Sequence, residues 1–403
     1  MIEKKIFNDT ATAFKLKSDL ELNRALLLFN VMGVPSLIKP GIFLTKYSLK
    51  AKLPIQPLIK NTIFDQFCAG TSKEDCKPVI KEMHQVNLSS ILDYSVEGKK
   101  TEKEFDSAFR IKKDLIQFAR EETEIPFAIF KPTALGSFEI WHKLSSHINL
   151  NDSEKEEWKK TKARVENLCK EAYNHGVRLY ADAEESWMQD AADDLMEEMM
   201  EKYNTEKALI FNTFQCYRWD RLDYLKELHS RAKEKGFKIG AKIVRGAYME
   251  KENKRAKKYG KKSPICENKK ATDLHFNNVL AYCLDNIEDI AVFIGTHNEV
   301  SNYLALQIME DQGIAKDDPR VWFSQLYGMS DQISYNLANK NYNTAKLVPF
   351  GPVKDVVPYL LRRAEENSSV EGQTNRELNL LRREKKRRKM ASEASKNDVR
   401  KQA

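Results

Sequence analysis

Residues 238–248 read KIGAKIVRGAY, a short run that is apolar and β-branched at its start and charged near its end. This composition predicts a buried strand with Arg245 and Gly246 at its carboxyl end. Further runs of the same kind lie at residues 90–98, 127–132, 177–184, 208–215, 290–298, 321–328 and 344–352. The sequence therefore contains eight candidate strands.

Helical patterns separate these runs. They lie at residues 155–174, 188–203, 219–235, 268–286 and 299–312. Strands that alternate with helices favour parallel βαβ units, and eight such units form a (β/α)₈ barrel. A doubly wound open sheet is the alternative, but the GxGxxG and GxxxxGK[ST] phosphate-binding loops are both absent. We predict an α/β barrel at residues 89–375, after a helical N-terminal arm at 1–88 and before a basic tail at 376–403.

Polar or reactive side chains end nearly every candidate strand. They are Lys131, Asp182, Gln215, Arg245, Thr296, His297, Asn298, Gln325 and Tyr327. In a barrel these residues share the C-terminal mouth, where barrel enzymes have their active sites. Each also has an ordinary explanation: Lys131 as a loop lysine, Asp182 as a helix cap and His297 as a hydrogen-bonded structural histidine. Their recurrence at one end of the strands favours a functional site.

The segment 358–367 predicts an amphipathic helix with two adjacent arginines, Arg362 and Arg363. Neighbours on a helix are about 100° apart, so a surface helix rarely aims both at one small target. A helix across the mouth of a pocket could bring both guanidinium groups to carboxylates. A charged surface face is the alternative.

The composition limits the other possibilities. At 403 residues with 31% charged side chains, the chain suits a soluble globular protein with one large domain or two modest ones. Its longest uncharged run, 25–38, is too short to span a bilayer, and the N-terminus resembles neither a secretion signal nor a transit peptide. Six scattered cysteines without metal-ligand spacing predict reduced thiols and no metal site.

The basic tail at 376–403 carries 11 lysines and arginines against 4 acidic residues, a balance of +7 out of the total of +8. The rest of the chain is nearly neutral, unlike a globally basic nucleic-acid binder. The tail has three interpretations: a solvated disordered end, a segment that contacts a membrane surface, or a nucleic-acid patch.

Seven motifs, in order, resemble the proline dehydrogenase (proline oxidase) family. They are FKPTALG (130–136), LYADAEE (179–185), FNTFQCY (211–217), GAKIVRGAYMEKE (240–252), GTHN (295–298), QLYGM (325–329) and YLLRRAEEN (359–367). The resemblance covers roughly residues 125–385 and is closer to the mitochondrial-type branch than to the large bifunctional bacterial proteins. It implies the monofunctional form and a distorted (β/α)₈ barrel that binds FAD at the strand C-termini.

The resemblance further implies oxidation of L-proline to Δ1-pyrroline-5-carboxylate, with the electrons passed to a membrane quinone. It assigns Asp182, Lys242 and Lys131 to catalysis, with Lys242 near the reactive flavin nitrogen and Lys131 also facing the substrate. Arg362 and Arg363 would clamp the substrate carboxylate, beside Tyr359 and Leu347. The residues assigned to FAD are Gln215, Lys242, Val244, Arg245, Gly246, Ala247, Thr296, His297, Asn298 and Glu366.

Partners and location follow from the same resemblance. A pyrroline-5-carboxylate dehydrogenase is an expected partner and nucleic acid is not. We expect a cytoplasmic protein peripheral to the inner membrane of a bacterium, or one at the mitochondrial inner membrane if the source is eukaryotic.

Leu347 departs from the family pattern, which has a tyrosine over the substrate ring at this position, four residues before the glycine that is Gly351 here. A branch that prefers 4-hydroxyproline also replaces this tyrosine. We expect proline to remain the better substrate, because leucine packs on a ring carbon but offers a hydroxyl no hydrogen bond.

Other classes of protein remain as alternatives. An aldolase that uses a Lys131 Schiff base would leave the arginine pair and Gln215 unexplained. A nucleic-acid-binding or scaffold protein would depend on the tail alone. A non-catalytic barrel would not need the polar strand ends.

Overall fold

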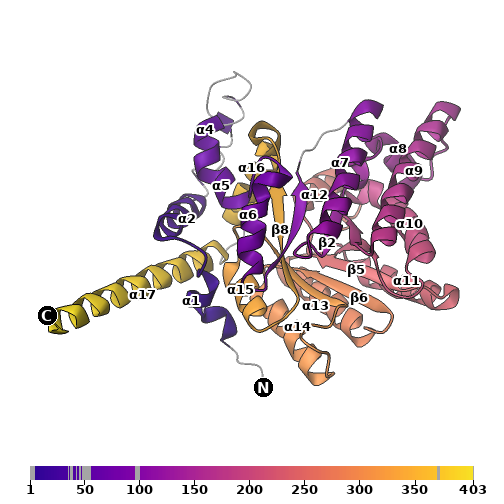
Figure 1. The fold of residues 1–403 in the computed structure, drawn as a ribbon. Helices are drawn as coiled ribbons and strands as arrows, with labels where there is room; N and C mark the ends of the chain where they lie inside the picture. The colour runs from indigo at the N-terminus through magenta and orange to yellow at the C-terminus, as the bar shows by residue number, and fades with distance from the viewer. Residues whose placement is uncertain are drawn as a thin grey trace.

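The computed structural model describes residues 5–34, 36, 40–41, 43–44, 47, 56–95, 100–369 and 373–402, without the side chains of 56, 58, 365–369, 373 and 396–402. Its centre is a single sheet of eight parallel strands in the order β1-β8-β7-β6-β5-β4-β3-β2 (Figure 1). First and last strand are neighbours in this order, as in a barrel, whereas a doubly wound sheet reverses its order halfway. The predicted α/β barrel is confirmed.

All eight predicted strand runs contain a strand. They are β1 (Ser89–Tyr94), β2 (Phe127–Phe130), β3 (Arg178–Ala181), β4 (Ile210–Gln215), β5 (Ile239–Val244), β6 (Ile290–Gly295), β7 (Val321–Leu326) and β8 (Thr344–Phe350).

Helices cover the outside of the barrel and include the five predicted ones. They are α6 (Lys73–His84), α7 (Glu102–Glu121), α8 (Phe138–Ser145), α9 (Asp152–His175), α10 (Ser186–Tyr203), α11 (Arg221–Lys235), α12 (Met249–Lys258), α13 (Lys269–Asp285), α14 (Glu299–Asp311) and α15 (Asp331–Asn339). Local sequence sets their ends. In α9, for example, Asn151 and Glu154 form a capping box, and Gly176 ends the helix at a φ of 67°.

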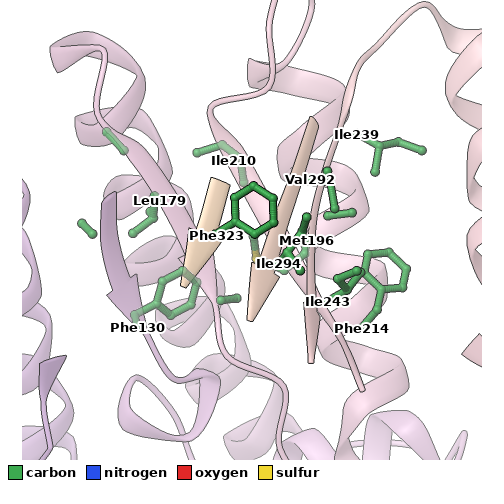
Figure 2. Packing of buried hydrophobic residues seen from close by; sticks show 14 of the residues in the cluster. Phe130, Leu179, Met196, Ile210, Phe214, Ile239, Ile243, Val292, Ile294 and Phe323 are labelled. Carbon is green, nitrogen blue, oxygen red and sulfur yellow. The ribbon is translucent and has the colours of Figure 1, made fainter. Parts of the chain in front are cut away.

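The main core lies between the strands and these helices. Figure 2 shows outward side chains such as Phe130, Leu179 and Val292 gathered with Met196 of α10. Inside the barrel, side chains of the opposite strand face form a smaller cluster that includes Phe127, Tyr180, Phe211, Phe293 and Trp322. The Phe127 ring meets the rings of Phe211, Phe293 and Trp322 edge-on, with centroids 5.0–5.4 Å apart.

Phe127, Phe211 and Trp322 lie at the first or second position of their strands, so they fill the bottom of the barrel, and Tyr180 and Phe293 lie further along β3 and β6. The interior positions two or four residues further along each strand are free to carry polar groups at the mouth.

A second cluster, which we call the terminal core, joins both ends of the chain to the barrel. Its N-terminal elements are α1 (Thr10–Ala13), α2 (Asp19–Met32), α4 (Gln56–Ile59), the π-helix η2 (Lys60–Phe64) and α5 (Asp65–Phe67), and its C-terminal elements are α16 (Val353–Ser369) and α17 (Gln373–Gln402). It comprises Ala13, Phe14, Leu22, Ala25, Phe29, Met32, Ile59, Phe64, Phe67, Cys68, Met329, Val356, Val357, Tyr359, Leu360, Ala364, Leu378, Leu380 and Leu381.

The expected N-terminal arm is therefore divided. Helix α2 begins after Ser18, which forms a capping box with Glu21, and packs in the terminal core. In contrast, Cys76, Ile80 and Met83 of α6 belong to the main core beside β1.

The tail is helical, so of its three interpretations the disordered end is wrong. Leu378 and Leu381 of α17 are buried, and the helix runs along α2 before it extends away from the body (Figure 1). Arg388 donates to the backbone oxygen of Phe14 at 2.8 Å and pairs with Asp19 at 2.8 Å. The buried leucines of α17 are spaced so that they share one helix face, and this face packs against the N-terminal arm. The charged residues of the tail gave no indication of this partner, because the arm lies about 360 positions earlier in the sequence.

Candidate active site at the barrel mouth

Asp182 joins two lysines from different strands at the mouth. It follows β3 and accepts a hydrogen bond from Lys131 Nζ, just after β2, at 2.7 Å, and one from Lys242 Nζ, on β5, at 2.5 Å. The Lys242 ammonium also lies 3.8 Å from the ring centroid of Tyr180. The barrel thus brings together all three residues assigned to catalysis.

Burial alone would raise the pKa of Asp182, but the two lysines hold its pKa well below the usual range. Burial lowers the pKa of Lys242, and Asp182 opposes this shift only in part. For Lys131 the balance is reversed: burial lowers its pKa, but Asp182, with smaller contributions from Tyr248, Asp93 and Glu184, raises it by more in total. Asp182 is therefore an ionised carboxylate that orients two ammonium groups and is a poor proton acceptor.

Two further acidic groups at the mouth were missed from the sequence. Asp93 on β1 pairs with the buried Lys112 of α7 at 3.4 Å. Glu184, two residues after Asp182, accepts hydrogen bonds from Thr133 N at 3.0 Å and from Thr133 Oγ1 at 2.7 Å. Burial raises the pKa of Glu184 to about 7. The sequence feature that could have identified both residues is a carboxylate near the end of a candidate strand, at 90–98 for Asp93 and at 177–184 for Glu184.

Gln215 is the last residue of β4 and Gln325 the last but one of β7, and their side chains differ in direction. Gln215 Nε2 donates to the backbone oxygen of Glu184 at 2.6 Å, which ties β4 to the loop after β3. Gln325 accepts from Ser334 Oγ of α15 at 2.7 Å, so it lies on the helix side of β7. The expectation that Gln325 shares the mouth is wrong, because successive side chains of a strand point to opposite faces.

The side chain of Arg245 is committed to the protein. Its guanidinium pairs with Asp273 Oδ1 at 2.7 Å and donates to Thr296 Oγ1 at 2.6 Å and to Ser301 Oγ at 3.0 Å. Any ligand contact from this residue would therefore come from its backbone.

Gly246 and Ala247 follow and are exposed, while Val244 at the end of β5 is half-buried. Gly246 has a φ of 124°, and a Cβ there would lie 2.1 Å from the Tyr217 ring. Only glycine fits this turn.

The Thr296–Asn298 segment follows β6. Thr296 Oγ1 accepts from Arg245, and Asn298 Oδ1 caps α14 by accepting from Val300 N at 2.9 Å. His297 Nδ1 lies 2.9 Å from Ser330 Oγ. Burial, with help from the charges of Lys346, Arg363 and Arg245, lowers the pKa of His297 to about 3, so its imidazole is neutral.

The arginine pair lies on α16, and both side chains are half-buried. The Arg363 guanidinium lies 5.2 Å from the Tyr359 ring, and its charge acts on His297. Tyr359 itself packs in the terminal core, whereas Leu347 of β8 packs on the interior aromatic cluster. The side chain of Glu366 lies outside the described residues.

Fold and site together define a class: an α/β barrel whose mouth carries two lysines bridged by Asp182, at the end of the strands where barrel enzymes have their active sites. The sequence profile of the family described as proline dehydrogenase matches residues 76–376. The chain belongs to the proline dehydrogenase family, oxidoreductases that act on CH–NH donors.

Three relatives illustrate the range of this similarity. The carbapenem antibiotics biosynthesis protein CarD of Pectobacterium carotovorum subsp. carotovorum is 34% identical over 80% of this chain and 83% of its own length. The mitochondrial proline dehydrogenase 1 of Caenorhabditis elegans is 27% identical over 95% of this chain and 88% of its own. The hydroxyproline dehydrogenase of Xenopus laevis is 31% identical over 93% of this chain and 88% of its own length.

Among solved structures, proline utilization A (PutA) from Bdellovibrio bacteriovorus superimposes with a TM-score of 0.71 at 21% identity. The match covers 92% of this chain but 40% of PutA. This similarity supports the fold, and the predicted resemblance to the mitochondrial-type members is confirmed by the relatives.

Proposed function

We propose that this protein is an FAD-dependent enzyme that oxidises L-proline to Δ1-pyrroline-5-carboxylate and passes the electrons to a quinone. The observation that carries the proposal is the Lys131–Asp182–Lys242 bridge at the mouth of a barrel of this family. An aldolase would need an unprotonated Lys131, but the carboxylate of Asp182 raises the pKa of this lysine.

In this proposal Arg362 and Arg363 bind the substrate carboxylate, and Lys131 and Asp182 orient the ring. Bound FAD would supply the two-electron acceptor for the hydride of proline C5, and the residues named here would hold both in place. Lys242 supplies a fixed positive charge beside the bound cofactor, which stabilises negative charge as it develops. Asp182 remains ionised and keeps both lysines in place.

The donor set fits such a cofactor. A pyrophosphate and a flavin ring need cations, neutral hydrogen-bonding groups and an open stretch of backbone. The neutral imidazole of His297 and the exposed Gly246–Ala247 backbone meet two of these needs, and Lys242 meets the third. Gln215, Val244, Arg245, Thr296, Asn298 and Glu366 complete the proposed FAD contacts.

The absorption spectrum tests this proposal directly. The purified protein, with FAD added, should show a flavin band that bleaches when L-proline is added without oxygen. Asp182→Asn should retain the band and lose turnover. No flavin binding would overturn the proposed function, and wild-type turnover by Asp182→Asn at all pH values would remove any role for this residue.

Hydroxyproline oxidation is the second candidate, because the Xenopus relative is named for this substrate. Leu347 lies at the interior cluster and has no group to bind a hydroxyl. We therefore expect a higher kcat/KM for proline, with a difference of about 1 kcal/mol for one hydrogen bond. A preference for 4-hydroxyproline would reverse the assignment.

We further propose that a membrane surface, where a quinone is reached, contacts α2 and α17. Leu20, Leu27 and Val31 of α2 are exposed. Lys385 and Arg382 of α17 donate to Asn23 and Asn30 of α2 at 2.7 and 3.0 Å, which places cations beside these apolar side chains. This combination suits anionic headgroups. None of the helices in the described part of the chain has the length and apolar character to cross a membrane.

Vesicle binding tests the membrane contact. Reversal of the exposed charges, Lys385→Glu with Lys386→Glu, should weaken binding to phosphatidylglycerol vesicles at low salt by about 1 kcal/mol or more per residue. Reduction of a soluble dye should be unchanged. Equal binding by both forms would return the tail to a solvated role, and a pyrroline-5-carboxylate dehydrogenase would then be the partner to test on this surface.

A further inference from the structure

Four charged side chains meet beneath the first turn of α17. Asp331, in the first turn of α15, pairs with Lys346 of β8 at 2.8 Å and with Lys17, between α1 and α2, at 3.2 Å. Glu377 of α17 is the fourth, and it is 3% exposed. The barrel, the arm and the C-terminal helix each contribute to this cluster.

Glu377 accepts a hydrogen bond from the residue that precedes α15. Ser330 precedes α15 with a φ of 50°, and its own side chain makes no cap hydrogen bond. Its backbone N–H instead donates to Glu377 Oε1. A carboxylate at a helix N-terminus is favourable, because it satisfies a free N–H and complements the helix dipole.

The Ser330 hydroxyl lies 2.9 Å from Nδ1 of His297. Contact at Nδ1 fixes the orientation of the imidazole and leaves Nε2 on the opposite side of the ring. A continuous path of two hydrogen bonds therefore connects α17 with the residue that follows Thr296 at the barrel mouth.

The neighbour of Glu377 reinforces this connection. Arg376 pairs with Glu299 of α14 at 2.9 Å and donates to Asn8 Oδ1 at 2.7 Å. The first turn of α17 thus contacts the starts of both helices that flank the His297 segment.

We propose that Glu377 is a positioning residue for the barrel mouth: through Ser330 it holds the His297 imidazole, so that docking of α17 sets how tightly FAD is bound. This inference rests on the proposed assignment of His297 to the FAD site.

Fluorescence titration of the unliganded protein with FAD tests the proposal. Glu377→Ala should raise the Kd for FAD about tenfold, the loss expected for one ordered hydrogen bond, and Glu377→Gln, which keeps an acceptor, should restore most of the affinity. Ser330→Ala should weaken binding to a similar degree, and the Ser330→Ala/Glu377→Ala double variant no further, because both act along one path.

The matched control is Glu384→Ala. Glu384 is also a buried carboxylate of α17, but its partners are Arg387 and Arg388 of its own helix and Thr10 of α1, and not Ser330. Its replacement should leave the Kd for FAD near that of the wild type. Equal affinity in Glu377→Ala and Glu384→Ala would overturn the proposal, as would additive losses in the double variant.

Hydrogen exchange of the unliganded protein separates this inference from the proposed function. Glu377→Ala should speed exchange in residues 297–302 and 328–334, whereas Glu384→Ala should not. If the wild type binds no FAD, the proposed function fails, and this comparison still decides whether Glu377 holds the segment. Should Glu377→Ala not fold, Ser330→Ala carries the test, and an unchanged Kd for FAD in that variant would overturn the proposal.

Discussion

The barrel and the terminal core differ in how the chain builds them. In the barrel, each strand pairs with strands one βαβ unit away, apart from the closing pair of β1 and β8. The terminal core instead brings α2 from one end of the chain against α16 and α17 from the other. The barrel carries the lysines and the proposed FAD contacts other than Glu366, whereas the arginine pair and Glu366 lie on α16, which the terminal core holds. Under the proposed assignment, substrate and cofactor contacts would depend on two cores of different origin.

We expect the largest loss of activity and stability for a substitution at the lysine–aspartate bridge, which the barrel strands build without the terminal core. Asp182→Ala removes the partner of two buried lysines, so we expect kcat/KM for proline to fall about 100-fold or more and stability to fall by about 3–5 kcal/mol. Urea unfolding and steady-state kinetics measure both. A variant with near wild-type values would show that the bridge is not the centre of the site.

A truncation in each core tests their separate roles. Leu360→Ala on α16 and Leu280→Ala on α13 remove equally buried side chains and should each cost about 2–5 kcal/mol. The α16 variant should also raise KM for proline about tenfold, because the arginines lose their position. The α13 variant should leave KM unchanged, and a KM increase of equal size in both would remove the distinction.

The turn after β5 offers a smaller effect within the barrel. Gly246→Ala places a Cβ 2.1 Å from the Tyr217 ring at a φ of 124°, so it should cost about 1–3 kcal/mol and weaken FAD binding. Gly176→Ala is the control, since its φ of 67° brings backbone strain but its Cβ meets nothing within 4 Å. It should cost about 1 kcal/mol and leave FAD binding intact.

The smallest effect compares two carboxylates with raised pKa values. Burial, with Asp331 nearby, raises the pKa of Glu377 to about 7, and burial raises that of Glu184 to about 7. Each folded-state pKa is above the unfolded value, so each contribution to stability is present at low pH and is lost as pH rises through about 7.

Between pH 6 and 8, the stability of the wild type relative to Glu377→Gln should therefore fall by about 1 kcal/mol, and the same holds relative to Glu184→Gln. Chemical unfolding at both pH values measures the two differences. If the stability relative to either glutamine variant does not change with pH, the carboxyl group of that glutamate is exposed to water and its pKa is not raised by burial.

Much of the mouth could be predicted because it follows from local repeats. Lys131, Asp182 and Lys242 each lie on or just after a strand, and parallel strands in a barrel present one rim. The prediction failed for Gln325, because alternation sends neighbouring side chains to opposite faces of β7. Asp93 was overlooked, since its partner Lys112 comes from a helix whose facing side the sequence does not mark.

The sequence by itself determined the eight βαβ units, the residues at the strand ends and the family, because strand periodicity and motif order are local properties of the chain. Only the tertiary structure decided that α17 is docked, that α16 shares its core with the arm, and that Glu377 reaches Ser330. Those contacts join residues far apart in the sequence. A side chain, apolar or charged, is stable in such a contact only when its partner is also present, and no local pattern specifies that partner.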